Sequence, residues 1–246
     1  IAMAGVLGEV ALALGCSQVW FGSDSQSTCV IKSEIENNVT RVQAQVAQEK
    51  VTFSLQTLGQ HFVTNALGAL ASVAALGGDV QRAAADLWLW RPGEGRGARK
   101  NIHAAFGTFE VIDDAYNANP ASMAAALDVL ALSKAKRRIA ILGDMRELGP
   151  NAPTIHEDLS NLQAFENIDL VHTVGPHMEA LYLKLAKKQK GLHSHTAQDF
   201  LGRFEHIFQE DDCILIKASL GTGLGLIVKS LCALDQTPQK STNKET

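Results

Sequence analysis

Apolar and polar positions alternate along the second half of the chain in a way that predicts strands and helices in regular succession. Short apolar runs bounded by turn residues indicate buried strands, and apolar residues three or four positions apart indicate amphipathic helices. The predicted strands lie near residues 109–112, 138–142, 170–174 and 213–216, and the predicted helices span 120–133, 154–165, 178–188, 197–208 and 224–233. This alternation is typical of an α/β fold with a doubly wound, mostly parallel, Rossmann-like sheet.

The first part of the chain has a different pattern. Residues 40–46 and 51–55 alternate between polar and apolar, which predicts an antiparallel hairpin with one face on a core. Apolar residues at helical spacing predict a helix over 59–76, and a shorter helix over 80–88 follows Asp79 as its N-cap. A helix over 1–14, a short strand at 19–21 and a polar turn at 23–27 complete this part of the prediction.

A glycine- and arginine-rich stretch, R-P-G-E-G-R-G-A-R at 91–99, separates the two patterns. Such a composition is typical of a solvated hinge, although arginine forks and glycine backbone also suit phosphate oxygens. We therefore expect one domain over residues 1–92 and a second over residues 93–234. Residues 235–246 are polar and contain a proline, which predicts a disordered tail.

Composition narrows the classes of partner. The 246 residues are 46% hydrophobic and carry a net charge of -4 without a basic field, so nucleic acid is not expected as a partner. No run reaches the roughly 18 consecutive apolar residues of a membrane span, and the apolar start contains Glu9 without a basic region before it. Four cysteines without a C-x-x-C pair fit buried thiols in a reducing cytoplasm rather than a zinc site or a disulfide framework.

One polar cluster lies between a predicted strand and a predicted helix. Five of the seven residues at 113–119 are polar, namely Asp113, Asp114, Tyr116, Asn117 and Asn119. In a parallel sheet, the loop that leaves the carboxyl end of a strand is where helix N-termini and free backbone N–H groups meet a ligand. Asp and Asn also cap helices, but the helix that Pro120 starts needs one cap only. The pattern therefore favours a binding loop.

Two further loops follow predicted strands. Residues 143–147, G-D-M-R-E, carry both signs of charge, for which a surface salt bridge is the simpler interpretation. Residues 217–223, K-A-S-L-G-T-G, run into G-T-G-L-G, an incomplete dinucleotide-binding fingerprint far from the N-terminus. A nucleotide-binding dehydrogenase is the alternative function that this second motif supports.

Three segments resemble a known family. D-D-A-Y-N-A-N-P-A-S-M at 113–123 resembles the signature of the Mur ligases that add D-alanyl-D-alanine to the UDP-N-acetylmuramoyl tripeptide. I-L-G-D-M-R-E-L-G at 141–149, with His156 after it, and G-Q-H-F-V-T-N-A-L-G-A-L-A at 59–71 resemble further segments of the same family. The stretch 217–220 departs from the family's K-G-S-R, because Ala218 replaces glycine and Leu220 replaces arginine.

The resemblance implies roles for individual residues. Nucleotide contacts fall to three of them, with Asn65 on the adenine ring, Asp114 on the ribose and Arg96, at the family's G-R position, on the phosphates. A site-shaping role falls to Tyr116, Asn117 and Asn119. The catalytic residues stay open, with Lys217 and His156 as candidates.

The resemblance also implies an ATP-dependent amide ligase of peptidoglycan synthesis. Its partners would be ATP, Mg²⁺, a UDP-N-acetylmuramoyl tripeptide and D-alanyl-D-alanine, and it would act as a cytoplasmic monomer. Such a ligase needs a P-loop, G-x-x-G-K-[ST], which this sequence does not contain. We therefore expect a C-terminal fragment that is inactive by itself, with its metal ligands upstream. The alternatives are a non-catalytic nucleotide- or partner-binding remnant and another Mur-type amide ligase.

Overall fold

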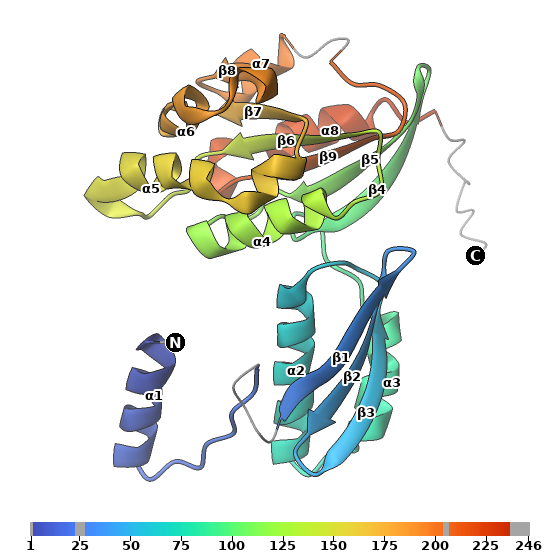
Figure 1. The fold of residues 1–246 in the computed structure, drawn as a ribbon, viewed down its shortest axis with the longest axis vertical. Helices are drawn as coiled ribbons and strands as arrows, with labels where there is room; N and C mark the ends of the chain where they lie inside the picture. The colour runs from blue at the N-terminus through green and yellow to red at the C-terminus, as the bar shows by residue number, and fades with distance from the viewer. Residues whose placement is uncertain (1, 23–27, 204–206, 237–246) are drawn as a thin grey trace, which may run out of the picture. The chain divides into compact units, whose positions relative to one another are not determined.

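A computed structural model describes residues 2–22, 28–203 and 207–236, and its chain divides into two compact units, one before and one after the Arg91–Pro92 bond (Figure 1). The predicted turn at 23–27 and residues 237–246 of the predicted tail lie outside the described residues. The predicted domain boundary lies next to this division. The assignment of the first unit to part of a ligase's central domain stays a prediction.

The first unit contains an antiparallel sheet of three strands in the order β1-β2-β3, where the strands are β1 (Thr28–Glu36), β2 (Val39–Val46) and β3 (Glu49–Leu55). The predicted hairpin is thus confirmed, and β1 adds a strand that was not predicted. Asn37 and Asn38 join β1 to β2 with φ angles of 49° and 62°. Asparagine tolerates this left-handed backbone, which a two-residue hairpin turn requires.

The two predicted helices are confirmed as α2 (Gln60–Ala75) and α3 (Val80–Asp86), and both contact this sheet. Phe53 and Leu55 of β3 share one core with Leu67 and Leu70 of α2. The side chain of Asp79 accepts a hydrogen bond from the backbone N–H of Arg82 at 2.9 Å, which confirms it as the N-cap of α3.

The remaining part of the first unit begins with α1 (Ala2–Ala13). The predicted strand at 19–21 is absent, because none of the described strands pairs with these residues and an unpaired segment cannot form a ladder.

The prediction of four buried thiols is also wrong, since only Cys213 is buried and Cys16 is exposed. Among the described residues, no helix has both the length and the apolar character that crossing a bilayer requires.

The second unit is a six-stranded sheet in the order β4-β5-β9-β6-β7-β8, with β4 antiparallel to β5 and every other neighbouring pair parallel. Its strands are β4 (Ala98–Ala104), β5 (Gly107–Asp114), β6 (Arg137–Gly143), β7 (Leu170–Val174), β8 (Lys190–Ser194) and β9 (Asp212–Lys217). Its helices are α4 (Pro120–Ala131), α5 (Ala152–Asp158), α6 (Met178–Lys184), α7 (Ala197–Leu201) and α8 (Gly225–Cys232). The predicted doubly wound, mostly parallel α/β fold is confirmed.

Several boundaries in this unit differ from the prediction. The strands β4 and β8 were not predicted, because β4 buries only Ile102 and β8 buries only Ser194. Predicted helices α5, α6 and α7 are shorter than expected, and 3₁₀ turns at Leu159–Asn161 and Gln163–Asn167 follow α5. Asp235 and Gln236, which were predicted to belong to a disordered tail, hydrogen-bond to the backbone of His103 in β4.

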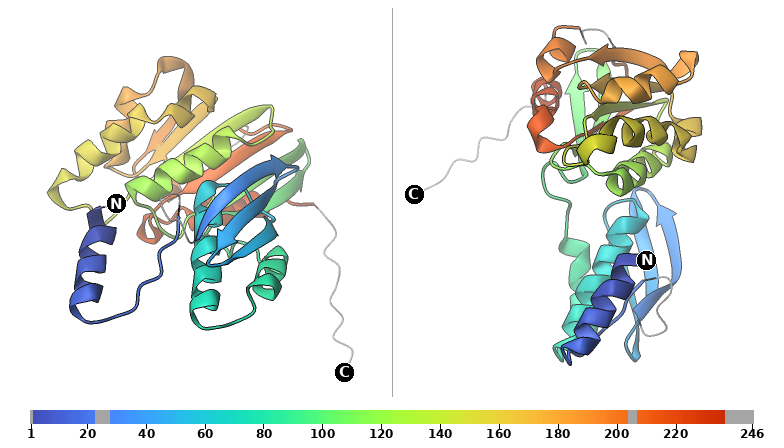
Figure 2. Two further views of the ribbon diagram at one scale, coloured as in Figure 1. Left: turned by 60° about the horizontal axis from the view of Figure 1, so that its bottom comes forward. Right: turned by 90° about the vertical axis from the view of Figure 1, so that its left-hand side faces the viewer.

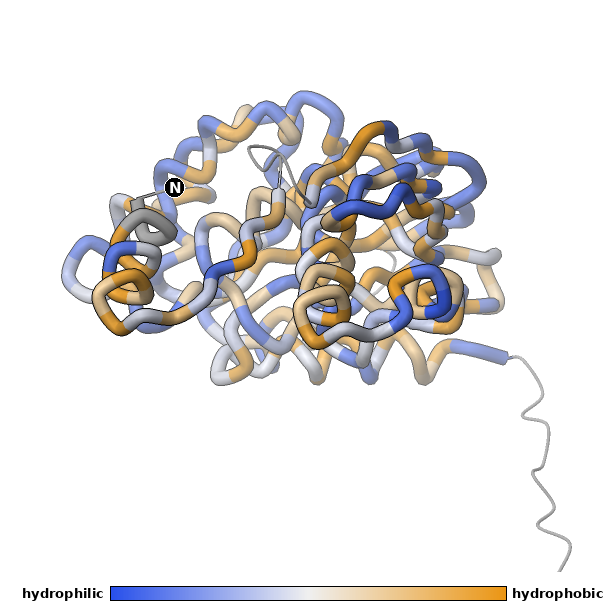
Figure 3. The backbone as a smooth tube through the Cα atoms, turned by 90° about the horizontal axis from the view of Figure 1, so that it is seen from below, coloured by the Kyte–Doolittle hydropathy of each residue, from blue (hydrophilic) through white to orange (hydrophobic). Residues whose placement is uncertain are grey.

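The central strands are buried on both faces. Ile139 and Ile141 of β6 pack with Ile227 of α8 in one core, while the alternate residues Ala140 and Leu142 are buried on the other face. Helix α4 contacts β6 and β9. The right-hand view in Figure 2 shows helices on both sides of this sheet, and Figure 3 shows hydrophobic and hydrophilic residues interleaved along the chain. Burial on both faces explains the near-continuous apolar runs of β6 and β9.

Candidate functional site

Three adjacent strands, β5, β9 and β6, end at the same edge of the sheet. We name the loops that follow them, residues 115–119, 144–148 and 218–223, the three-loop cluster. Asp114 at the end of β5 lies opposite Lys217 at the end of β9 in the ladder. The prediction placed Asp113 and Asp114 on a loop, but they are the last two residues of β5, because pairing with β9 continues through Asp114.

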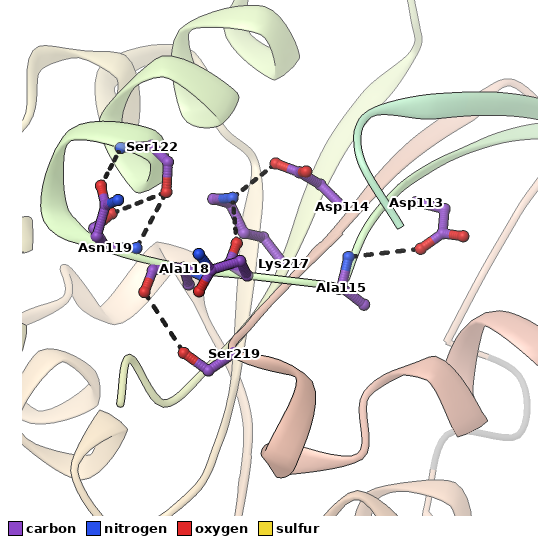
Figure 4. Close-up of polar contacts among 9 residues, drawn as sticks. Asp113, Asp114, Ala115, Ala118, Asn119, Ser122, Lys217 and Ser219 are labelled. Carbon is purple, nitrogen blue, oxygen red and sulfur yellow. Dashed lines mark hydrogen bonds and ion pairs between the residues drawn. The ribbon is translucent and has the colours of Figure 1, made fainter. Parts of the chain in front are cut away.

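Lys217 and Asp114 form an ion pair at this edge (Figure 4). The ammonium Nζ lies 2.7 Å from Asp114 Oδ2 and donates to the backbone oxygen of Asn117 at 3.0 Å. The Lys217 side chain is 2% exposed, whereas that of Asp114 is 20% exposed. Burial raises the pKa of the Asp114 carboxyl group above its usual value, and the charge of Lys217 opposes that rise. The ammonium group of Lys217 is therefore occupied by Asp114 and by the Asn117 carbonyl group. The exposed part of the Asp114 carboxylate can accept a hydrogen bond from a ligand hydroxyl.

Part of the glycine-rich stretch before β4 folds against this edge. The backbone N–H groups of Gly95 and Gly97 donate to the side chain and backbone of Asp113 at 3.0 and 2.8 Å, and Tyr116 N–H donates to Gly95 O at 3.0 Å. Gly95 has a φ of +69°, and a Cβ there would lie 2.9 Å from Tyr116 Cβ. The stretch 93–97 therefore needs glycine where it meets Tyr116.

This contact brings Arg96 to the edge. Its guanidinium carbon lies 4.3 Å from the centroid of the Tyr116 ring, in a cation–π arrangement. The positive charge of Arg96 also acts on Asp114, whose pKa it tends to lower. Arg96, Tyr116, Asp114 and Lys217, which the sequence singled out separately, thus lie in one neighbourhood.

The side chains of Asn119 and Asn117 make different local hydrogen bonds. Asn119 Oδ1 accepts from Ser122 N–H at 2.8 Å, and Ser122 Oγ accepts from Asn119 N–H at 3.0 Å, which makes a capping box for α4. The capping interpretation is therefore right for Asn119. Asn117 Oδ1 accepts from Ala118 N–H at 2.9 Å, and its side chain is exposed next to exposed Tyr116.

His156 is fixed in the interior beside the second loop. It is fully buried, its Nε2 accepts from Met145 N–H at 2.9 Å, and its Nδ1 lies 2.6 Å from Ala152 O. Accepting at Nε2 and donating at Nδ1 define the neutral form, and burial lowers the pKa of the ring. Because both nitrogens are occupied, the geometry supports a positioning role for His156 rather than a catalytic one.

The second loop does not form the surface salt bridge that its charges suggested. Asp144 is 6% exposed and its Oδ1 accepts from Met178 N–H at 2.9 Å, so it ties β6 to α6. Among the described residues, no ion pair involves Asp144, Arg146 or Glu147.

Ser219 connects the three loops, and the sequence reasoning missed it. Its Oγ accepts from Arg146 N–H at 3.0 Å and donates to Ala118 O at 3.4 Å, while its N–H donates to Asp144 O at 3.2 Å. Its position in the family's K-G-S-R pattern was the available signal. Ala218, which replaces the glycine of that pattern, fits because Gly143 faces it; a Cβ on Gly143 would lie 2.7 Å from Ala218 Cβ.

The other predicted site features lie elsewhere or in other contexts. Asn65 is on an exposed position of α2, in the first unit. The G-T-G-L-G segment forms a 3₁₀ turn at Leu220–Thr222 and the start of α8, after the last strand rather than the first. Within residues 2–22, 28–203 and 207–236, no three His, Cys, Asp or Glu side chains are grouped as a metal site would require.

The fold and this edge define the class of protein: a doubly wound α/β protein whose polar loops gather where parallel strands end. The chain belongs to the Mur ligase family, because residues 98–220, half of its length, match the family described as Mur ligase, glutamate ligase domain.

Similar proteins agree with this assignment. The UDP-N-acetylmuramoyl-tripeptide–D-alanyl-D-alanine ligase of Bacillus subtilis is 33% identical over 73% of this chain, and that of Rickettsia prowazekii is 29% identical over 85%. The crystal structure of MurF from Acinetobacter baumannii matches 92% of this chain with a TM-score of 0.75 and 28% identity. The chain spans 40% and 46% of the two ligases and 49% of the crystallised chain.

Proposed function

We propose that this chain carries the nucleotide- and substrate-binding edge of a ligase that uses ATP to join D-alanyl-D-alanine to UDP-N-acetylmuramoyl-tripeptide. The observation that carries the proposal is the Lys217–Asp114 pair at the carboxyl edge of the sheet, with Arg96 held next to it. It is supported by the names of relatives about 30% identical to this chain.

In the proposed reaction the terminal carboxylate of the tripeptide is phosphorylated by ATP, and the amine of D-alanyl-D-alanine displaces phosphate from the acyl phosphate. Such chemistry depends on positioning and charge stabilisation and needs no nucleophilic side chain. Asp114 would accept hydrogen bonds from the ribose hydroxyls, Arg96 would contact phosphate oxygens, and Asn65 would contact adenine. Tyr116 and Asn117 would line the site, and Asn119 would contribute by fixing the start of α4.

Among the described residues, no three His, Cys, Asp or Glu side chains are grouped into a metal site built from protein ligands alone. The sequence also contains no P-loop motif. In phosphoryl transfer, the P-loop and the metal provide most of the charge stabilisation. We therefore expect the 246 residues alone to bind nucleotide without turning it over. The cytoplasmic location and the monomeric state stay predictions.

Calorimetric titration of the chain with ATP tests the nucleotide role. Asp114→Ala removes one hydrogen-bond acceptor that carries charge, and we expect ATP affinity to fall about tenfold to a hundredfold. Asp128→Ala is the matched control, because Asp128 is an exposed aspartate on α4. Equal affinity of Asp114→Ala and the unaltered chain, with native circular dichroism in both, would rule out the nucleotide role.

A second candidate function is a non-catalytic nucleotide-binding module. A chimera separates the two, in which the N-terminal part of the B. subtilis ligase that this chain does not match is joined before Ile1. Phosphate release that depends on both the UDP-tripeptide and D-alanyl-D-alanine supports the ligase. Nucleotide binding without any such release supports the module.

A further inference from the structure

Arg146 is exposed, yet it is held at both its backbone and its guanidinium group. Its backbone N–H donates to Ser219 Oγ at 3.0 Å, and Nη2 donates to Gly221 O at 2.6 Å. The preceding N–H, that of Met145, is bound by buried His156. A free arginine side chain would lose considerable rotamer freedom on binding a ligand, whereas this one is already oriented.

The guanidinium has room and spare donors. A Cβ on Gly221 would lie 2.5 Å from Arg146 Nη1, so the side chain rests where residue 221 has no side chain. Of the five guanidinium N–H donors, the bond to Gly221 uses one. No carboxylate of the described residues lies within ion-pair distance of it. Its charge is therefore available to an anion.

The position of Arg146 places that charge within the three-loop cluster. Leu220 N–H donates to Tyr116 O at 3.1 Å, which links the turn under Arg146 to the loop that holds Tyr116 and Asn117. Leu220 itself is 64% exposed and apolar at the position where the K-G-S-R pattern has arginine. The guanidinium of Arg146 reaches the residue directly after it.

We propose that Arg146 is the anion-binding residue of the three-loop cluster and supplies, from the loop after β6, the positive charge that Leu220 does not. Its ligand is an oxyanion, either a phosphate or a carboxylate, because a planar guanidinium binds both through paired N–H donors. This inference rests on the proposed function, since it assigns one more group of the same site.

Titrations followed by the amide resonances of Arg146, Ser219 and Gly221 test it, with inorganic phosphate, ADP and D-alanyl-D-alanine as separate probes. Arg146→Ala should weaken binding of at least one probe about tenfold or more. Arg203→Ala is the matched control, because Arg203 is also exposed and also donates to one backbone carbonyl, His193 O at 3.1 Å. It should leave all three affinities unchanged.

The probes identify the anion. Loss of phosphate and ADP binding with unchanged dipeptide binding assigns a phosphate, and loss confined to the dipeptide, with no binding of its C-terminal amide, assigns a carboxylate. Adding Leu220→Arg to Arg146→Ala should restore much of the lost affinity, because it returns a guanidinium to the neighbouring position.

Three results would overturn the proposal: no probe shifts these amides in the unaltered chain, Arg146→Ala binds all probes normally, or Arg203→Ala has the same effect. If Leu220→Arg restores no affinity to the Arg146→Ala protein, the inference that Arg146 supplies the charge that Leu220 does not is overturned. Failure of the proposed function has a different signature, namely ATP affinity that is insensitive to Asp114→Ala.

Discussion

At the scale of single residues, Lys217 and Asp114 depend on each other because both leave water to form one pair. Lys217→Met would leave the Asp114 carboxylate in a largely buried place without its partner charge. We expect the second unit to lose about 3 kcal/mol of stability, the lower end for a broken buried pair because Asp114 is partly exposed. Urea unfolding followed by circular dichroism measures this loss. Tryptophan fluorescence does not report on the second unit, because all three tryptophans lie in the first unit. The double variant Lys217→Met, Asp114→Leu should recover part of the loss, and equal stability of Lys217→Met and the unaltered chain contradicts the argument.

A buried histidine gives the second unit a dependence on pH. His172 in β7 is 2% exposed, its Nδ1 accepts from Leu192 N–H at 2.8 Å, and burial lowers its pKa from 6.5 to about 4. Its contribution to stability is complete above pH 6.5 and is lost as the pH falls toward 4. In this range the imidazole of His172 is protonated in the unfolded chain but stays neutral in the folded chain. The loss amounts to about 3 kcal/mol.

Unfolding free energies measured between pH 7 and pH 4 test this dependence. His172→Asn keeps an acceptor for Leu192 N–H and does not titrate, so its stability should fall less over this range than that of the unaltered chain. Parallel pH profiles for the two proteins would show that His172 titrates normally.

At the scale of elements, the start of α4 depends on one capping residue. Asn119→Ala removes the acceptor for Ser122 N–H, and we expect a loss of about 1 kcal/mol, the usual effect of removing an N-cap. Asn119→Ser should keep most of the stability. Asn117→Ala is the control, because Asn117 is exposed in the same loop but does not cap the helix. A larger loss from Asn117→Ala than from Asn119→Ala would contradict this assignment.

At the scale of the whole molecule, the second unit has what independent folding requires. Its six-stranded sheet is covered on both faces and its core includes Val111, Phe200, Ile214 and Leu231. We expect a protein that starts at Pro92 to fold and to unfold cooperatively with a native amide spectrum for this unit. A poorly dispersed spectrum, or a broad transition that sharpens only when the residues up to Arg91 are present, would show that the first unit is needed.

The elements could largely be predicted from the sequence, whereas their ends and edges could not. Apolar runs identified β5, β6, β7 and β9, because strands buried on both faces leave a strong local signal. The edge strands β4 and β8 were not predicted, because a strand that buries only one residue leaves no such signal in the sequence. The absent strand at 19–21 is the converse case, because an apolar run without a partner strand does not form a ladder.

The sequence by itself determined the α/β class and the residue types at the ends of the parallel strands. Only the tertiary structure decided which of them meet. It inserted β9 between β5 and β6, and this brought Lys217 opposite Asp114. It folded the glycine-rich stretch onto Tyr116, and it assigned His156 and Ser219 to holding loops together. The physical reason is that local periodicity records burial within one element, whereas strand order and loop contacts depend on residues about a hundred positions apart in the chain.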